Sequence, residues 1–395
     1  MLPITGYEKE KDTMNERARL EGPLTCDGVA SRRDQKEFLQ VEREVNRGNP
    51  HWVPPIWSER RKIVGFKHHP FYDDADRQAF IARRGSRPVG RILAIVNHGH
   101  NRRYEEQRGF VGFFECFDDR EAAAMLFDHA FDWLRQQGMT DVRGPVHPSL
   151  NYEVGLLVDG FDSPPTFLIP YNPEYYEKLY QESGFEKTQD LFSYEAHIDI
   201  IKDLDPKLKF VIDEATRRFK VNCRPLDRKH FKKDVRTFLE IYNRSLEKTW
   251  GYVPMSEAEI AEQSAGLKHL IVPELTSIAE IDGEPVGAGF GLLDYNQIIS
   301  KIDGRLFPFG WLRLLTGKRK IDRLRLISTN VLPKYQKWGI GLVTLSRILP
   351  DAVDFGIQVG EFSWVLESNK LSRGTIERGG ATRVKTHRLY DRSLD

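Results

Sequence analysis

The stretch of sequence that decides the fold is residues 331–342, which read Val331-Leu-Pro-Lys-Tyr-Gln336-Lys-Trp-Gly339-Ile-Gly341-Leu342. An apolar-rich strand is predicted to end here, glycines follow, and the apolar periodicity of residues 339–355 predicts a helix. Glycine lets a backbone approach a ligand closely, and the free N–H groups at the start of a helix bind phosphate with the help of the helix dipole. The segment is therefore predicted to hold a pyrophosphate.

The chain contains an internal repeat. Residues 81–90 (IARRGSRPVG) align without gaps with residues 278–287 (IAEIDGEPVG), and each has the strand-turn-strand pattern of a hairpin. Two further matches occur at nearly the same offset and in corresponding order, 52–54 with 252–254 and 180–185 with 376–381. A repeat of this length predicts two copies of one domain.

The repeat predicts a mixed α/β fold with two pseudo-symmetric tandem lobes. The expected boundaries are a polar leader over residues 1–30, a first lobe over 31–198 and a second lobe over 199–395. In the second lobe we expect helices over 207–219, 231–246, 339–355 and 370–378, a hairpin over 275–294, and strands over 323–331, 360–366 and 382–390. Residues 298–320 are an insertion whose basic end is interpreted as a solvated loop.

The composition is that of an ordinary globular protein. The chain has 395 residues, 40% of them hydrophobic and 30% charged, and a formal net charge of +1. This balance argues against a nucleic-acid partner. The sequence shows neither a signal peptide nor an apolar run long enough to span a bilayer, and its three cysteines are scattered. We therefore expect a cytoplasmic protein with no membrane partner and no metal; the oligomeric state stays open.

Residues 331–342 resemble the acetyl-coenzyme A signature of the GNAT (GCN5-related N-acetyltransferase) superfamily, V-x-P-x-x-[QR]-x-x-G-x-[GA]. Long segments such as 147–180 also resemble a bacterial group of tandem-GNAT proteins. The resemblance implies acetyl-CoA or another acyl-CoA as co-substrate, with loop amides on the pyrophosphate and the preceding strand on the pantetheine arm. The residues it implies for cofactor binding are Thr329, Asn330, Val331, Gln336, Lys337, Trp338, Gly339, Ile340, Gly341, Leu342 and Asn369.

Two positions depart from the family pattern. Where many members have a tyrosine as general acid this chain has Ile376, and where histone-type members have a glutamate base it has Arg325. Positioning the amine against the thioester can itself contribute several kcal/mol. Our candidate base is Glu367 and our candidate acid is Tyr390. A surface carboxylate and a packed aromatic residue are the alternative interpretations.

The first half is predicted to have lost the cofactor. Residues 113–125 correspond to the signature, but they contain no glycine and place Asp118, Asp119 and Glu121 where a phosphate would bind. Carboxylates repel a pyrophosphate. The first lobe would then shape the acceptor pocket. Candidate acceptor-binding residues lie in a polar-aromatic loop over 147–176 and between two predicted helices; they are Asn151, Tyr171, Asn172, Trp250 and Tyr252. A well-packed aromatic loop between the two copies is the alternative interpretation.

These observations predict an acyl-CoA-dependent N-acyltransferase that uses no metal and acts on an amine of a small molecule or peptide by direct attack on the thioester. Acetyl-CoA is the expected donor. Two alternatives stay open. One is an aminoacyl-tRNA-dependent peptidyltransferase, which the intact pyrophosphate loop argues against. The other is a non-catalytic protein that binds acyl-CoA, which Ile376 and Arg325 favour.

Overall fold

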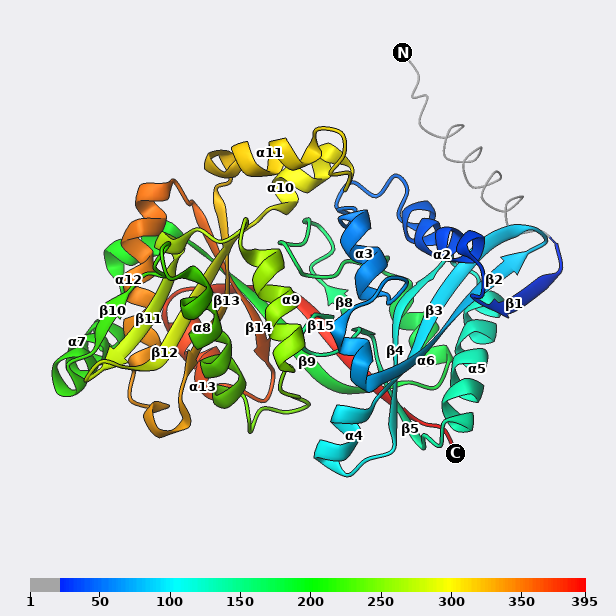
Figure 1. The fold of residues 1–395 in the computed structure, drawn as a ribbon, viewed down its shortest axis with the longest axis horizontal. Helices are drawn as coiled ribbons and strands as arrows, with labels where there is room; N and C mark the ends of the chain where they lie inside the picture. Colours follow the sequence, from blue (N-terminus) through cyan, green and yellow to red (C-terminus); the bar gives the residue numbers. More distant parts are fainter. Residues whose placement is uncertain (1–21) are drawn as a thin grey trace, which may run out of the picture.

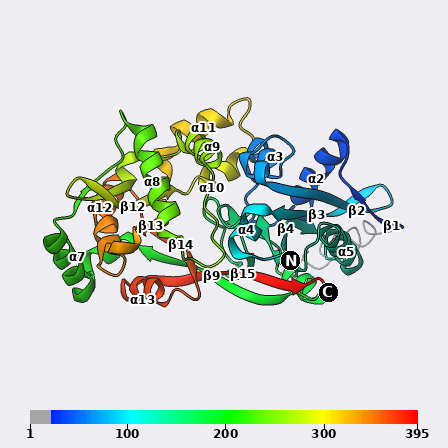
Figure 2. The same ribbon diagram turned by 60° about the horizontal axis from the view of Figure 1, so that its bottom comes forward.

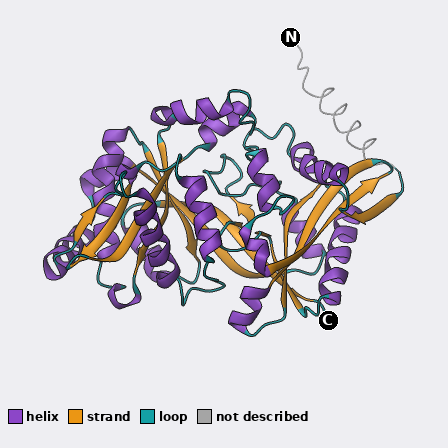
Figure 3. Cartoon of the chain, viewed as in Figure 1, coloured by secondary structure: helices purple, strands orange, loops and turns teal. Residues whose placement is uncertain are grey.

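The computed structural model describes residues 22–395. One continuous mixed sheet runs through the molecule, with helices on both of its sides (Figures 1 and 3). Its main path is, in spatial order, β1 (Leu24–Gly28), β2 (Ala75–Arg84), β3 (Arg87–Asn97), β4 (Arg108–Cys116), β5 (Asp141–Gly144), β15 (Thr382–Ser393), β9 (Glu186–His197), β14 (Val359–Leu366), β13 (Arg323–Val331), β12 (Glu284–Leu293), β11 (Thr276–Ile281) and β10 (Asn222–Arg224). β8 (Leu156–Asp159) pairs with β15, and β6 (Val146–His147) forms a short ribbon with β7 (Glu153–Val154).

The helices complete two lobes. The first lobe, around β1 to β5, carries α2 (Arg32–Val45), α3 (Trp57–Ile63), α4 (His98–Tyr104), α5 (Arg120–Gln136) and α6 (Tyr176–Glu182). The second lobe, around β10 to β14, carries α7 (Pro206–Phe219), α8 (Phe231–Ser245), α9 (Glu257–Leu267), α10 (Asn296–Ile299), α11 (Gly310–Thr316), α12 (Ile340–Phe355) and α13 (Lys370–Arg378).

The two lobes share one order of elements. In the first lobe the hairpin β2–β3 is followed by β4, α5, β5 and α6, and in the second the hairpin β11–β12 is followed by β13, α12, β14 and α13. In each lobe the long helix packs on the hairpin, α5 on β2 and β3 and α12 on β11 and β12. The mixed α/β class and the tandem lobes expected from the repeat are confirmed.

The last strand of each half lies beside strands of the other half. β9 ends the first half of the chain, yet it pairs antiparallel with β14, with His197 opposite Val359. β15 ends the second half, yet it pairs antiparallel with β5, with Tyr390 opposite Gly144. β9 and β15 also pair with each other, and Figure 2 shows them running together between the lobes. The sheet is therefore continuous across the two halves of the chain. The lobe boundary between residues 198 and 199 stays a prediction that rests on the repeat.

Two segments are more ordered than the sequence suggests. Leu24–Gly28, placed in the predicted leader, forms β1 against β2, while residues 1–21 lie outside the described part of the chain. The insertion at 298–320 is mostly helical and contains α11. Both are short and lack a long apolar period, so local pattern alone does not reveal them. No helix between residues 22 and 395 has the length and apolar character needed to cross a bilayer.

Candidate active site

A cavity of about 1830 Å³ lies between the two lobes. Typical small-molecule sites measure roughly 300–1,000 Å³, so this one is unusually large. It extends from the start of α12 along the free side of β13 and into the first lobe beside α3, and its lining is mainly apolar. One end is walled by apolar side chains of α8, α9 and the insertion, among them Phe238, Leu239, Leu267, Leu270, Ile299, Leu306 and Leu314.

β13 and β14 separate where the cavity begins. They pair in parallel only from Arg323 opposite Val359 to Leu326 opposite Phe362. On its other side β13 stays paired with β12 as far as Val331. Residues 327–331 therefore present a strand edge toward the cavity, which they line. An extended ligand can add to such an edge by main-chain hydrogen bonds, so the pantetheine-binding role predicted for Thr329, Asn330 and Val331 has the geometry it needs.

A β-bulge marks the point of separation. The register of β12 and β13 shifts between Phe290 and Gly291, which lie opposite Ser328 and Leu326. Ile327 is the extra residue, and it also lies just beyond the last pair with β14. Ile327 thus has no strand partner on either side within the described sheet. Bulges often re-aim groups beside active sites, and this one lies at the apex of the cleft.

The start of α12 is an open anion site. Gly339 is its N-cap residue, with φ 82° and no side-chain cap, and Lys337 also has a positive φ of 71°. The backbone N–H groups of residues 337–341 donate to no acceptor among residues 22–395. A Cβ on Gly339 would lie 2.6 Å from Cγ1 of Val211, so glycine is required there. Five free donors at a helix N-terminus match the predicted pyrophosphate site.

The other predicted cofactor residues lie around this site. Gln336 donates from Nε2 to the carbonyls of Val331 and Ser245, at 3.0 Å each, and so ties the loop to β13 and α8. Asn369 caps α13 through its side-chain oxygen. Both line the cavity, as do Ile340, Gly341 and Leu342. Trp338 does not: it lies outside the lining, 46% exposed, with the Arg218 guanidinium 4.5 Å from its ring.

The geometry gives no support to the two predicted catalytic residues. Glu367 pairs on the surface with Lys187, at 3.0 Å between carboxylate and Nζ. Tyr390 is buried in the first lobe, and its hydroxyl donates to Glu177 at 2.8 Å. Neither side chain lines the cavity. Tyr390 stays out of the cavity lining because β15 pairs with β9 and β5, and not with β14, so its end enters the first lobe's core.

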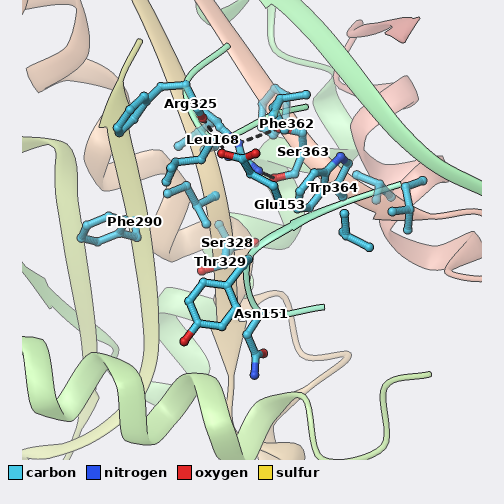
Figure 4. A pocket seen from close by; sticks show the side chains of 18 of the residues that line it. Asn151, Glu153, Leu168, Phe290, Arg325, Ser328, Thr329, Phe362, Ser363 and Trp364 are labelled. Atoms are coloured by element: carbon cyan, nitrogen blue, oxygen red, sulfur yellow. Dashed lines mark hydrogen bonds between the residues drawn. The ribbon is translucent and has the colours of Figure 1, made fainter. Parts of the chain in front are cut away.

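Two other charged residues meet inside the cavity. The guanidinium of Arg325, on β13, donates to Ser363 Oγ and to the Phe167 carbonyl, at 2.9 Å each. Burial lowers its pKa to about 10, against the opposing effect of nearby carboxylates, so it stays cationic at neutral pH. Glu153, on β7 of the first lobe, lies close to Arg325 and Ser363 (Figure 4). Sequence reasoning included Glu153 in the functional loop but had no spacing signal to single it out.

Glu153 belongs to a network of ion pairs that is largely buried. Arg60 pairs with Glu153 at 3.1 Å and with Glu42 at 3.2 Å, and Arg91 pairs with Glu42 at 2.8 Å. Burial raises the pKa of Glu115, at the far end of the network, to about 8. All five side chains line the cavity, so its first-lobe wall is polar where its second-lobe wall is apolar.

The structure brings all five predicted acceptor-binding residues to the cavity. Asn151 Nδ2 donates to the Val253 carbonyl at 2.8 Å, while its Oδ1 is buried without a partner among the described residues. Asn172 holds the loop by pairing with the Leu157 backbone. Tyr171 donates to a loop carbonyl, Trp250 stacks under an arginine, and the Tyr252 hydroxyl bonds an asparagine. Of the five, Asn151 has a free polar atom to offer a ligand.

The corresponding site in the first lobe is filled by the chain itself. Asp119 caps α5 by accepting from the Ala122 amide at 3.1 Å, and Arg84 binds the same carboxylate. Where β4 and β5 separate, the Phe113 amide donates to Nδ1 of His147 at 3.0 Å. A Cβ on Gly112 would lie 1.6 Å from the Val146 carbonyl oxygen, so β6 occupies this cleft closely. These contacts agree with the predicted loss of the cofactor.

Comparison with known proteins places the chain. No family model matches it. It is 35% identical over 372 residues to the bacterial ceramide synthase of Caulobacter vibrioides, an alignment that covers 91% of this chain and 94% of that protein. It is 31% identical over 371 residues to protein YghO of Escherichia coli, covering 92% and 94%.

Solved structures share the fold at low sequence identity. A tandem GNAT protein from the clavulanic acid biosynthesis pathway superposes with a TM-score of 0.55 at 12% identity, covering 94% of this chain and 99% of that one. A GCN5-related N-acetyltransferase from Sphaerobacter thermophilus gives 0.53 at 12% identity, covering 94% and 97%. The fold is thus one that acyltransferases use. The chain has the fold of tandem GNAT proteins, and it belongs to the family that includes the bacterial ceramide synthase of C. vibrioides and YghO of E. coli.

Proposed function

We propose that this protein transfers a long-chain acyl group from acyl-CoA to the amino group of a long-chain amino alcohol or a related amine. The observation that carries the proposal is the cavity, which is about 1830 Å³, mainly apolar and continuous with the pyrophosphate site. An acetyl group and a small amine would leave most of it empty. The relative at 35% identity is named a ceramide synthase, and a ceramide is an N-acylated long-chain amino alcohol.

The acyl-CoA donor binds to residues of the second lobe. The amides of residues 337–341 bind the pyrophosphate, and the free edge of β13 pairs with the pantetheine arm. This direction brings the thioester to the bulge at Ile327. We infer that a backbone amide at the bulge stabilises the negative charge that develops on the thioester oxygen. The acyl chain then follows the apolar wall of α8, α9 and the insertion.

The acceptor amine binds beside residues of the first lobe. Its nitrogen attacks the thioester carbonyl carbon, the carbon–sulfur bond breaks, and coenzyme A leaves as the thiolate, which takes up a proton from the solvent. The nitrogen loses a proton, and Glu153 is the carboxylate placed to accept it. The ion pair with Arg60 holds Glu153 in the cavity. Asn151 Oδ1, which has no partner among the described residues, accepts a hydrogen bond from the acceptor's hydroxyl group.

The test is a matrix of purified protein with acyl-CoA donors and amine acceptors of graded chain length. Release of coenzyme A is followed with a thiol reagent, and the amide is identified by mass spectrometry. We expect kcat/KM to rise with chain length on both axes and the product to be an N-acyl amino alcohol. A preference for acetyl-CoA with short amines would overturn the proposal. Tight acyl-CoA binding without turnover of any amine would favour a non-catalytic acyl-CoA-binding protein.

A further inference from the structure

The insertion between β12 and β13 carries an exposed apolar surface. Five large side chains project from it, and we call them the α11 patch: Phe307 (80% exposed), Phe309 (70%), Trp311 (45%), Leu312 (45%) and Leu315 (43%). They lie within nine residues of sequence, although large exposed hydrophobic side chains elsewhere in the described chain are scattered. Large exposed apolar side chains gathered in one short segment are typical of an interaction site.

The other side of the same segment faces the cavity. Leu306 and Leu314 alternate with the residues of the α11 patch and line the cavity, together with Ile299 of α10. The segment also contacts the first lobe, because Trp57 donates to the backbone carbonyls of Gly304 and Asp303. Figure 1 shows α10 and α11 along one edge of the molecule, near the junction of the lobes. The insertion thus contributes one side to the cavity and the other side, the α11 patch, to the molecular surface.

The charge around the α11 patch is positive. Residues 296–321 contain six basic residues and one acidic residue, although the whole chain has a net charge of +1. The acidic residue, Asp303, is paired with Arg43. Lys301, Arg313 and Lys320 are exposed and form no ion pair with any residue the structure describes. Aromatic side chains flanked by free cations are typical of segments that bind an anionic membrane surface.

A second copy of the chain fits this surface less well. A two-fold interface places the same patch on both sides, so the free cations of one protomer would meet those of the other. An anionic bilayer instead offers negative charge to the cations and an apolar layer to the phenylalanines and tryptophan.

We propose that the α11 patch docks on the surface of an anionic lipid bilayer and brings the cavity to the membrane. Phe307, Phe309 and Trp311 enter the interfacial region while the basic residues contact lipid headgroups. The inference deepens the proposed function, on which its purpose rests, because long-chain substrates reside in bilayers. The docking itself requires no turnover and is tested without it.

The experiment is flotation of the full-length protein with vesicles of phosphatidylcholine alone or with about 30% phosphatidylglycerol. We expect binding to the anionic vesicles that weakens in high salt, because salt screens the headgroup charge. The double variant Phe307→Ser/Phe309→Ser should bind at least about tenfold more weakly, because two exposed aromatic side chains no longer enter the interface. The matched control, Phe210→Ser/Val353→Ser, removes side chains that are 66% and 51% exposed elsewhere and should bind like the wild type.

Three outcomes would overturn the inference. One is wild-type protein that binds neither type of vesicle. Another is an equal loss of binding in the control variant. The third is a wild-type dimer by light scattering that Phe307→Ser/Phe309→Ser dissociates without changing vesicle binding, which would assign the patch to a second copy. Turnover of water-soluble medium-chain substrates is measured in parallel. If the proposed function fails, the wild type shows no turnover but still binds vesicles; if docking fails, turnover in solution remains.

Discussion

The start of α12 and the start of α5 occupy corresponding positions in the repeat, but their N–H groups are satisfied differently. At α12 a glycine caps the helix and five successive amides have no acceptor within residues 22–395. At α5 the carboxylate of Asp119 caps the helix and is itself neutralised by Arg84. Both helices expose the same positive end of a dipole. In one lobe that end is left for a ligand, and in the other the chain supplies the anion.

The strands before these helices differ in the same way. β13 separates from β14 and presents a free edge to the cavity, whereas the corresponding cleft beside β4 contains β6, with His147 bound to the Phe113 amide. Under the proposed function, the first lobe keeps the fold while its own chain takes the place of each part of acyl-CoA: a carboxylate stands for the phosphate, and a strand with an imidazole stands for the pantetheine arm. The segment that fills this cleft also contributes to the shared cavity, because β7, which pairs with β6, carries Glu153.

The largest expected effect on the difference between the two helix starts comes from a substitution at Gly341. A Cβ there meets only ordinary contacts, the nearest at 3.7 Å, so Gly341→Asp should fold while placing a carboxylate at the pyrophosphate site, as Asp119 does in the first lobe. A pair of like charges about 4 Å apart repels by roughly 4 kcal/mol near a protein surface, so we expect about a thousandfold loss of acyl-CoA affinity.

Calorimetric titration measures this loss, and circular dichroism checks the fold. Gly341→Asn has the same size without the charge and should lose far less affinity. Equal losses in the two variants would show that size rather than charge excludes the ligand.

The second prediction concerns the residue that the first lobe contributes. Glu153→Gln should lower kcat about a hundredfold with little change in acyl-CoA affinity, because the amide cannot accept the proton of the attacking amine. The matched control is Glu367→Gln, which removes a surface carboxylate paired with Lys187 and should leave kcat unchanged. Steady-state assays of both variants decide between the two carboxylates; the reverse pattern would restore Glu367 as the base.

The third prediction asks whether the first-lobe site can be reopened. Asp119→Ala removes a helix cap and leaves Arg84 without its buried partner, so the free energy of unfolding should fall by about 1–3 kcal/mol. Urea denaturation measures the loss. Acyl-CoA should still bind at one site per chain, because β6 continues to occupy the cleft. Titration with a stoichiometry of two would contradict that interpretation.

The smallest expected effect is on the pH dependence of stability. Burial raises the pKa of Glu115 to about 8 from its ordinary value of 4.5. The folded state therefore keeps a proton that the unfolded state releases, and this contribution to stability is lost as the pH rises from about 4.5 to 8, by at most about 1.4 kcal/mol per pH unit. Glu115→Gln cannot titrate, so its stability should fall less steeply over this range. Parallel slopes in denaturation series from pH 5 to pH 9, at roughly unit steps, would exclude Glu115 as the source.

Much of the fold could be predicted because its signals are local. The predicted helices over 207–219 and 370–378 and the strand over 323–331 agree with α7, α13 and β13 to within a residue. Apolar period and terminal glycines depend on near neighbours, so they are visible in one sequence. The predicted pyrophosphate loop belongs to this class: its N–H groups without an acceptor among the described residues are those of the backbone of residues 337–341, and the glycines that permit this conformation lie within the same loop.

The catalytic side chains belong to the other class. The sequence predicts catalytic roles for Tyr390 and Glu367 from their places in terminal parts of strands, but which lobe a strand enters is decided by sheet pairing. β9 and β15 are long and similarly patterned, and their exchange moves Tyr390 into the first lobe's core. Glu153 reaches the cavity because β6 and β7 fill a cleft whose shape comes from β4 and β5. Contacts between residues far apart in sequence leave no periodic trace.

By itself, then, the sequence determined the repeat, the mixed α/β class, the resemblance to GNAT proteins and the open helix start that suits a pyrophosphate. Each of these follows from short-range pattern and backbone conformation. The tertiary structure alone decided the strand exchange, the size of the shared cavity and the charged residues that meet in it. Those features depend on how two lobes pack, and packing brings together side chains that no local spacing connects.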